Sequence, residues 1–255
     1  MITPFLAHTP SFVQYVTDGT NSAQSAIDAI RTALKAIGWT EPVLNTLYSP
    51  ARSDCAQLRL TLAIGSSPTQ ITYVVRDHVG RLVNNDTLTR QNIATGTTYN
   101  IYCGDTYVYH EYNNGASVWG CALLHREPDP IAEPVPVYFA SYGPLKNDGV
   151  TSAQLLVYNN WVAASGAGMY YDLLGWRGYT NTTDHFSAQG SMMFYPMECV
   201  SSSWMYGRLP NVLLLDSSQW AGNTFELPLD ETTIGTFRVI RSGSINNFVA
   251  AVRIS

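Results

Sequence analysis

The stretch that decides the fold class is TYVYHEYNNGASVWGCALL, residues 106–124. Its two halves are rich in β-branched and aromatic residues, which favour extended strands. Between the halves lies Asn113-Asn114-Gly115, and an Asn-Gly pair readily adopts the positive φ angles of a tight hairpin turn. The sequence therefore predicts a β-hairpin over residues 106–124.

Further strand patterns lie on both sides of this hairpin. Apolar side chains alternate with polar ones in residues 58–64, and a β-branched run follows a Gly-Ser-Ser-Pro turn at residues 70–76. This period of two is typical of strands, whereas the polar residues 84–98 predict a long loop. After the hairpin, short apolar runs predict buried strands at residues 137–140, 154–158, 192–195, 212–215, 236–241 and 247–254.

One helix is predicted, over residues 22–38. Apolar residues recur there at spacings of three and four, which forms one stripe; they are Ala23, Ile27, Ile30, Leu34 and Ile37. A polar residue among 20–22 can cap the start, and Gly38 suits the left-handed position just past the end. We expect an amphipathic helix that lies on a small antiparallel sheet or on a neighbouring subunit.

A proline-rich segment divides the chain. Residues 127–136 carry four prolines within nine residues, so this segment cannot form a helix or a central strand. It predicts either a domain boundary or a rigid crossover between two sheets. The expected fold is mainly β (α+β): an N-terminal α+β domain over residues 1–126, a linker, and a β-sandwich or barrel-like domain over residues 137–255.

The composition favours a protein that is covered by other proteins. Charged residues make up 13% of the chain, against about a quarter in ordinary soluble domains. Few charges lower the cost of burying surface in an interface. The net charge is −5 and the 14 Lys and Arg are scattered, which argues against nucleic-acid binding. No long apolar run or basic leader is present, so we expect no membrane contact and assembly in a cytoplasm.

Catalytic and cofactor motifs are not found in the sequence. Phosphate-binding glycine loops, nucleophile elbows and zinc-ligand spacings do not occur, so we expect no cofactor and no enzymatic activity. Two adjacent pairs, Asp77-His78 and Asp184-His185, keep a hydrolase open as a remote alternative. The four cysteines are expected to be buried and reduced, although a cross-strand Cys103–Cys121 disulfide is conceivable.

The aromatic residues raise the question of binding. The chain has 16 tyrosines and 6 tryptophans, which can serve ordinary sheet packing, protein–protein contact or stacking on sugars. A glycan-binding module would use Tyr107, Tyr109, Trp119, Tyr171 and Trp176 as its platform, with a host surface glycan as partner. The candidate interface residues are Ile27, Ile30, Leu34, Trp39, Tyr107, Tyr109, Trp119, Tyr171, Trp176, Trp204 and Arg208.

Several segments resemble virion structural proteins of tailed bacteriophages. They are the helix that ends Leu34-Lys35-Ala36-Ile37-Gly38-Trp39, the segment Gly104–Tyr109, and the segments 194–197 and 204–211. The resemblance implies a subunit of a neck, tail or baseplate that forms three- or six-fold rings without a cofactor. Its partners would be copies of itself and other virion proteins, and it would be assembled in the cytoplasm of a bacterial host.

Overall fold

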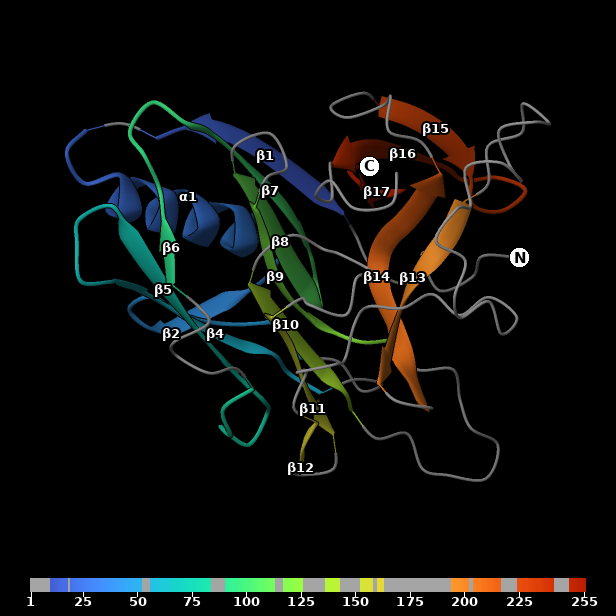
Figure 1. Ribbon diagram of the computed structural model, residues 1–255, viewed down its shortest axis with the longest axis horizontal. Helices are drawn as coiled ribbons and strands as arrows, with labels where there is room; N and C mark the ends of the chain where they lie inside the picture. The colour runs from blue at the N-terminus through green and yellow to red at the C-terminus, as the bar shows by residue number, and fades with distance from the viewer. Residues whose placement is uncertain are drawn as a thin grey trace.

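The computed structural model describes residues 10–17, 19–51, 56–83, 90–112, 117–125, 136–142, 152–157, 160–162, 194–201, 204–216, 224–240 and 248–255. Three antiparallel sheets and one helix form this part of the chain (Figure 1). The predicted mainly β fold, with a helix packed on antiparallel sheets, is confirmed.

The central sheet has seven strands in the order β1-β7-β8-β9-β10-β11-β12. The strands are β1 (Ser11–Val16), β7 (Thr98–Gly104), β8 (Tyr107–Tyr112), β9 (Ser117–Leu123), β10 (Tyr138–Tyr142), β11 (Ser152–Val157) and β12 (Asn160–Val162). The predicted hairpin is β8–β9, with a register that runs from Tyr107 opposite Ala122 to Tyr112 opposite Ser117. The hairpin therefore forms the middle of the sheet.

A five-stranded sheet and the helix form a second layer. The strands, in their order in the sheet, are β2 (Thr40–Val43), β3 (Thr46–Tyr48), β4 (Arg59–Ile64), β5 (Gln70–Arg76) and β6 (Arg90–Asn92). Strand β6 lies inside the stretch that was predicted to be a loop, and it pairs with β5. This local prediction was wrong because the pairing partner, rather than a local apolar pattern, makes the segment a strand.

Helix α1 (Ser22–Ala36) begins where the sequence predicts and ends slightly before residue 38. The side chain of Asn21 accepts a hydrogen bond from the Gln24 amide at 3.2 Å, and Gly38 has a φ of +96°. The apolar stripe contacts strands of both the five-stranded and the central sheet. One continuous core thus joins α1, the five-stranded sheet and one face of the central sheet.

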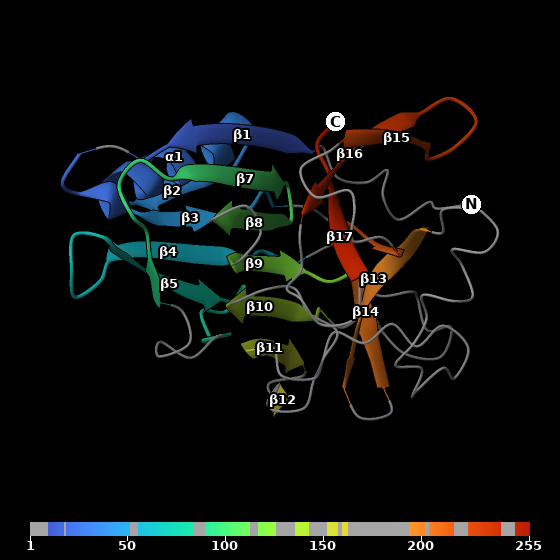
Figure 2. The ribbon, with the colours of Figure 1, turned by 45° about the horizontal axis from the view of Figure 1, so that its top comes forward.

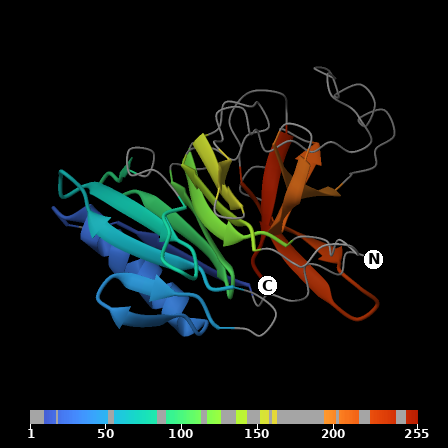
Figure 3. The same ribbon diagram turned by 90° about the horizontal axis from the view of Figure 1, so that it is seen from below.

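The third sheet has the strand order β13-β14-β17-β16-β15. Its strands are β13 (Phe194–Ser201), β14 (Trp204–Asp216), β15 (Thr224–Pro228), β16 (Ile234–Ile240) and β17 (Phe248–Arg253). Within the described residues this sheet is open and does not close into a barrel. Figure 3 shows it beyond the central sheet, on the side away from α1.

The predicted domain boundary does not separate the sheets. Strand β10 pairs with β9, from Tyr138 opposite Leu123 to Ser141 opposite Gly120, so the first sheet continues past the proline-rich segment. Residues 127–135 lie outside the described residues. The prediction placed 137–162 with the C-terminal domain, whereas β10, β11 and β12 complete the central sheet because they continue its ladder of hydrogen bonds.

Candidate functional site

The helix residues predicted as an interface lie in the protein's own core. Ile27, Ile30 and Leu34 are at most 1% exposed, and Trp39 is 3% exposed. The Trp39 indole nitrogen donates a hydrogen bond to the Gly104 carbonyl at 2.9 Å, which ties the exit of α1 to the central sheet. The prediction of an outer surface at these four residues is therefore wrong: the apolar stripe is covered by strands of the same chain.

The hairpin residues predicted as an interface are buried too. Tyr107, Tyr109 and Trp119 are at most 1% exposed, since one face of β8–β9 meets the α1 core and the other meets the third sheet. They cannot act as stacking platforms for a glycan in this conformation, so the prediction is wrong for these three residues. Tyr171, Trp176 and the side chain of Trp204 lie outside the described residues. Arg208 is half-buried and its backbone pairs with His125 at 2.8 and 3.1 Å.

A cluster of polar side chains, here called the polar seam, joins the central sheet to the third sheet. It consists of Gln14, Asn100, Tyr102, Glu111 and Arg238. Asn100, Tyr102 and Glu111 are buried, Arg238 is half-buried and Gln14 is exposed. The Glu111 carboxylate accepts hydrogen bonds from the Asn100 amide at 2.9 Å and from the Tyr102 hydroxyl at 2.7 Å. Gln14 donates to Asn100 at 2.8 Å, and Arg238 donates to the Tyr102 hydroxyl at 3.2 Å. Burial, and then the nearby Glu111 charge, raise the pKa of the Tyr102 phenol above its ordinary value.

Two more hydrogen bonds hold the same pair of sheets together. The Tyr109 hydroxyl donates to the Pro210 carbonyl at 3.2 Å, and the Asn211 amide donates to the Tyr107 hydroxyl at 2.9 Å. Asn211 is fully buried and has a φ of +58°, a backbone conformation that asparagine tolerates better than most residues. These contacts satisfy buried polar groups between layers, so we interpret them as structural.

A histidine that the sequence analysis did not single out lies in the α1 core. The hydroxyl of Tyr99 contacts His110 Nδ1, and the Tyr73 hydroxyl lies 3.4 Å from the same atom. Burial lowers the pKa of His110 well below its ordinary value, so the imidazole is neutral. Neither His110 Nε2 nor Trp119 Nε1 has a hydrogen-bond partner among the described residues. The alternation of side chains along β8 places His110 on the same face as the apolar Val108. This pattern in the sequence could have indicated that His110 is buried.

The Asp77-His78 pair does not form a catalytic dyad. The buried Asp77 carboxylate binds the Arg81 side chain at 2.6 Å and accepts from the Arg81 amide at 2.7 Å. His78 Nδ1 instead lies 2.6 Å from the Tyr138 hydroxyl. The two side chains have different partners, because adjacent residues point in different directions. Asp184 and His185 lie outside the described residues.

The two described cysteine side chains are free, as predicted. Cys103 and Cys121 are both buried, and burial raises the pKa of the Cys103 thiol to about 12. Val108 of β8 pairs with Cys103 on one side and with Cys121 on the other. A whole strand therefore separates the two residues, so the conceivable disulfide is not formed.

Exposed apolar side chains gather at one end of the molecule. This region, here called the loop end, comprises residues 16–17, 19–22, 43–45, 63–69 and 93–97. Its most exposed large apolar residues are Val16 at 58%, Val43 at 61%, Leu44 at 72% and Ile64 at 41%. None of these described residues carries a charge. Figure 2 shows the turns that follow β1, β4 and β6 lying together at the left of the molecule.

Hydrogen bonds between the turns fix this grouping. The Leu62 amide donates to the Asn45 carbonyl at 2.8 Å, and the Ala23 amide donates to the Pro68 carbonyl at 3.0 Å. The Ile93 amide donates to the Thr69 carbonyl at 2.7 Å, and Thr95 donates to the Gly19 carbonyl at 2.8 Å. The loop end is therefore one connected surface built from four separate parts of the sequence.

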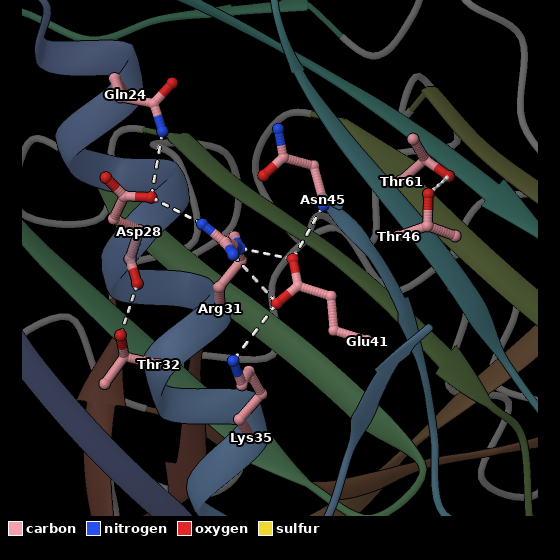
Figure 4. A network of polar contacts seen from close by, with 9 residues as sticks. All are labelled: Gln24, Asp28, Arg31, Thr32, Lys35, Glu41, Asn45, Thr46 and Thr61. Carbon is pink, nitrogen blue, oxygen red and sulfur yellow. Dashed lines mark hydrogen bonds and ion pairs between the residues drawn. The ribbon is translucent and has the colours of Figure 1, made fainter. Parts of the chain in front are cut away.

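An ionic network braces the turn that carries Val43 and Leu44 (Figure 4). Glu41 accepts from Arg31 at 2.6 and 3.0 Å, and from Lys35 at 3.3 Å. The same carboxylate accepts the Asn45 amide at 2.8 Å. The hydrogen bond from Arg31 is the main cause that lowers the pKa of Glu41 to about 2. Helix α1 thus holds the β2–β3 turn in place, and the turn presents its apolar residues outward.

Two further kinds of site, a metal-ion site and a membrane-spanning helix, are not found in the described residues. Within the described residues, no group of three or more His, Cys, Asp or Glu side chains is placed to hold a metal ion. No helix there is long and apolar enough to cross a membrane. Comparisons with protein-family models, curated proteins and solved structures find no significant match.

Proposed function

We propose that this chain is a non-catalytic structural subunit of a tailed-bacteriophage particle, in its neck, tail or baseplate, and that the loop end is one of its contact surfaces. The observation that carries the proposal is the grouping of four exposed apolar residues among loop-end residues that, as far as the structure describes them, carry no charge. Single exposed apolar residues are common on proteins, but several of them at one end of the molecule favour a surface that other molecules cover.

The exposed apolar area and the rigidity of the loop end suit contact with another protein. Covering Val43, Leu44 and Ile64 removes apolar area from water, and the described residues of the loop end carry no charge that would have to be desolvated in return. The turns are cross-linked by backbone hydrogen bonds and braced by Glu41, so little conformational freedom remains to be lost on binding. A rigid and partly apolar surface suits a permanent assembly contact.

The interior of the protein also supports this role. Buried polar groups that were candidates for chemistry have structural partners instead: the polar seam joins two sheets, and the Asp77–Arg81 contact closes the turn after β5. The resemblance of several segments to phage virion proteins is the reason for proposing a phage particle as the assembly. The low content of charged residues is consistent with a subunit that is covered by neighbours.

A complementation experiment with two matched valines tests the proposal. Val43 at the loop end and Val79 at the far end of the same sheet are each 61% exposed. In a phage that encodes this chain, Val43→Asp should leave the purified protein folded but reduce infectious particles by at least tenfold. Val79→Asp should complement like the unaltered gene.

Mass spectrometry of purified particles supplies the second readout. The chain should be present at a fixed copy number in wild-type particles, and the Val43→Asp protein should be depleted. Absence of the chain from intact particles, or equal complementation by both variants, contradicts the proposal.

A further inference from the structure

Within the part of the chain that the structure describes, strand β1 is a sheet edge with no strand on its outer side. Natural proteins shield edge strands with prolines, bulges, charges or short length, because an open edge pairs with other chains. Among the edges of the described sheets, β6 and β12 have three residues each. Strand β2 contains Pro42 and a register shift, β13 contains Pro196 and register shifts, and β15 carries Glu226 and ends at Pro228. Strand β1 has none of these devices.

The six residues of β1, SFVQYV, hold an unbroken register with β7 from Ser11 opposite Cys103 to Val16 opposite Thr98. No proline and no charged side chain interrupts them. In Figures 1 and 2 β1 lies at the upper margin of the central sheet, with β7 on its inner side. The pairing edge of β1 is therefore continuous, and its six residues are uncharged.

The register shows which backbone groups face outward. The Thr17 amide donates to the Thr97 carbonyl at 3.0 Å, so this pair belongs to the hydrogen-bonded set of the ladder. Such pairs recur at every second residue of an antiparallel ladder, which directs Val13 and Tyr15 toward β7. The amides and carbonyls of Phe12, Gln14 and Val16 consequently point to the open side. None of them bonds to another backbone group of the described chain.

We propose that β1 pairs with β1 of a second copy of this chain, antiparallel, about a two-fold axis that passes beside Gln14. In this register Gln14 faces Gln14 of the other copy, and Phe12 faces Val16. All three outward residues then form hydrogen-bonded pairs, and each pair exchanges two backbone bonds. The central sheets of the two copies become one continuous sheet.

This register is favoured over its neighbours. A shift by one residue would place opposing side chains on different faces of the joined sheet. A shift by two would leave one outward residue of each strand without a partner. Only the register centred on Gln14 uses Phe12, Gln14 and Val16 together.

The side chains support the same arrangement. Val16 is 58% exposed and would be covered by Phe12 of the second copy. Phe12 itself is already positioned, since its ring centroid lies 5.2 Å from that of Tyr102 and 5.7 Å from the Arg238 guanidinium carbon. Pairs of aromatic and β-branched residues across strands are stabilising, and β1 itself carries no charged residue.

This inference deepens the proposed assembly role and rests on it for its biological purpose, because it names one partner and one surface. The two can nevertheless fail separately. A chain that is found in particles but is monomeric alone would remove the pairing and leave the assembly role. A chain that forms this dimer but is missing from particles would do the reverse.

A charge-swap experiment tests the two-fold axis. The unaltered protein should be a dimer by light scattering at micromolar concentration. Gln14→Lys and Gln14→Glu should each be monomeric, because like charges meet across the axis, and an equimolar mixture should restore a heterodimer. Val79→Lys, at an exposed position far from β1, should remain dimeric. Circular dichroism and thermal melting check that each variant is folded, since Gln14 also donates to Asn100.

Oxidative cross-linking tests the register. Cα atoms of a hydrogen-bonded antiparallel pair lie about 5.5 Å apart, which is within disulfide range. Gln14→Cys should therefore form a covalent dimer at least tenfold faster than Val16→Cys, and the unaltered protein supplies the background from the native cysteines. A monomeric unaltered protein, a mixture that stays monomeric, or equal cross-linking by both variants overturns the proposal.

Discussion

The two faces of the central sheet are buried by different chemistry. Toward α1 the sheet presents Val108, His110 and Trp119, in a core that is mostly apolar. Toward the third sheet it presents Tyr107, Tyr109 and Glu111, which form directed hydrogen bonds. Strand β8 supplies residues to both sets through simple alternation, and its neighbour β9 supplies Trp119. One face is stabilised mainly by removed apolar area, and the other depends on each polar partner being present.

The largest expected effect is on the apolar face. Trp119→Ala removes a side chain that is 1% exposed and stacks on Tyr73 with ring centroids 3.9 Å apart. Truncation of a buried large aromatic residue costs about 3–5 kcal/mol. Urea unfolding should show this loss, and Trp119→Phe should recover more than half of it. A loss below about 1 kcal/mol would show that the ring is not part of the core.

The polar seam should respond to the loss of one acceptor. Glu111→Ala leaves the Asn100 amide and the Tyr102 hydroxyl without their acceptor, and an orphaned buried group costs about 1–3 kcal/mol. The cost should shrink when Tyr102→Phe is already present, since that variant has no hydroxyl to satisfy. A double-mutant cycle by urea unfolding measures this coupling, and strict additivity would contradict the direct contact.

The smallest effect is a pH dependence from His110. Tyr73, Tyr99 and Trp119 surround its ring, and burial lowers its pKa in the folded protein. The unfolded chain therefore binds a proton below about pH 6.5 that the folded chain does not bind. Stability present above that pH is lost as pH falls, with a slope of at most about 1.4 kcal/mol per pH unit from this group.

The His110→Phe variant is the control for this slope. Unfolding free energies measured between pH 7 and pH 5 should decline more steeply in the unaltered protein than in the variant. Equal slopes would mean that the imidazole can be protonated in the folded state. The result separates titration of His110 from that of the carboxylates, which both proteins share.

Local patterns in the sequence predicted the helix and the hairpin better than they predicted which layers cover them. Helix α1 and the β8–β9 hairpin followed from apolar periodicity and the Asn-Gly turn, because both signals are contained in a short stretch. Strand β1 was not predicted, since its partner β7 lies more than eighty residues further along the chain and its six residues lack a strong apolar alternation. Pairing across such a distance leaves little trace in the local sequence.

The candidate site was harder to predict than the fold. Tyr107, Tyr109 and Trp119 were expected on a surface because aromatic residues are frequent in interfaces, yet the third sheet and α1 bury them. Which layer covers a strand depends on residues far away in the chain. The loop end did carry a local signal: Val43 and Leu44 are apolar residues between Pro42 and Asn45, where a turn would ordinarily be polar.

The continuation of the central sheet into β10, β11 and β12 determines how the chain can be divided for expression. A fragment that stops at residue 126 would remove β10, one of the two partners of β9, and leave the amides and carbonyls on that side of a hydrophobic strand unpaired, which invites aggregation. A fragment that extends through Val162 retains all seven strands. Even so, its Tyr107, Tyr109 and Glu111 would face water, so polar replacements on that face should accompany such a truncation.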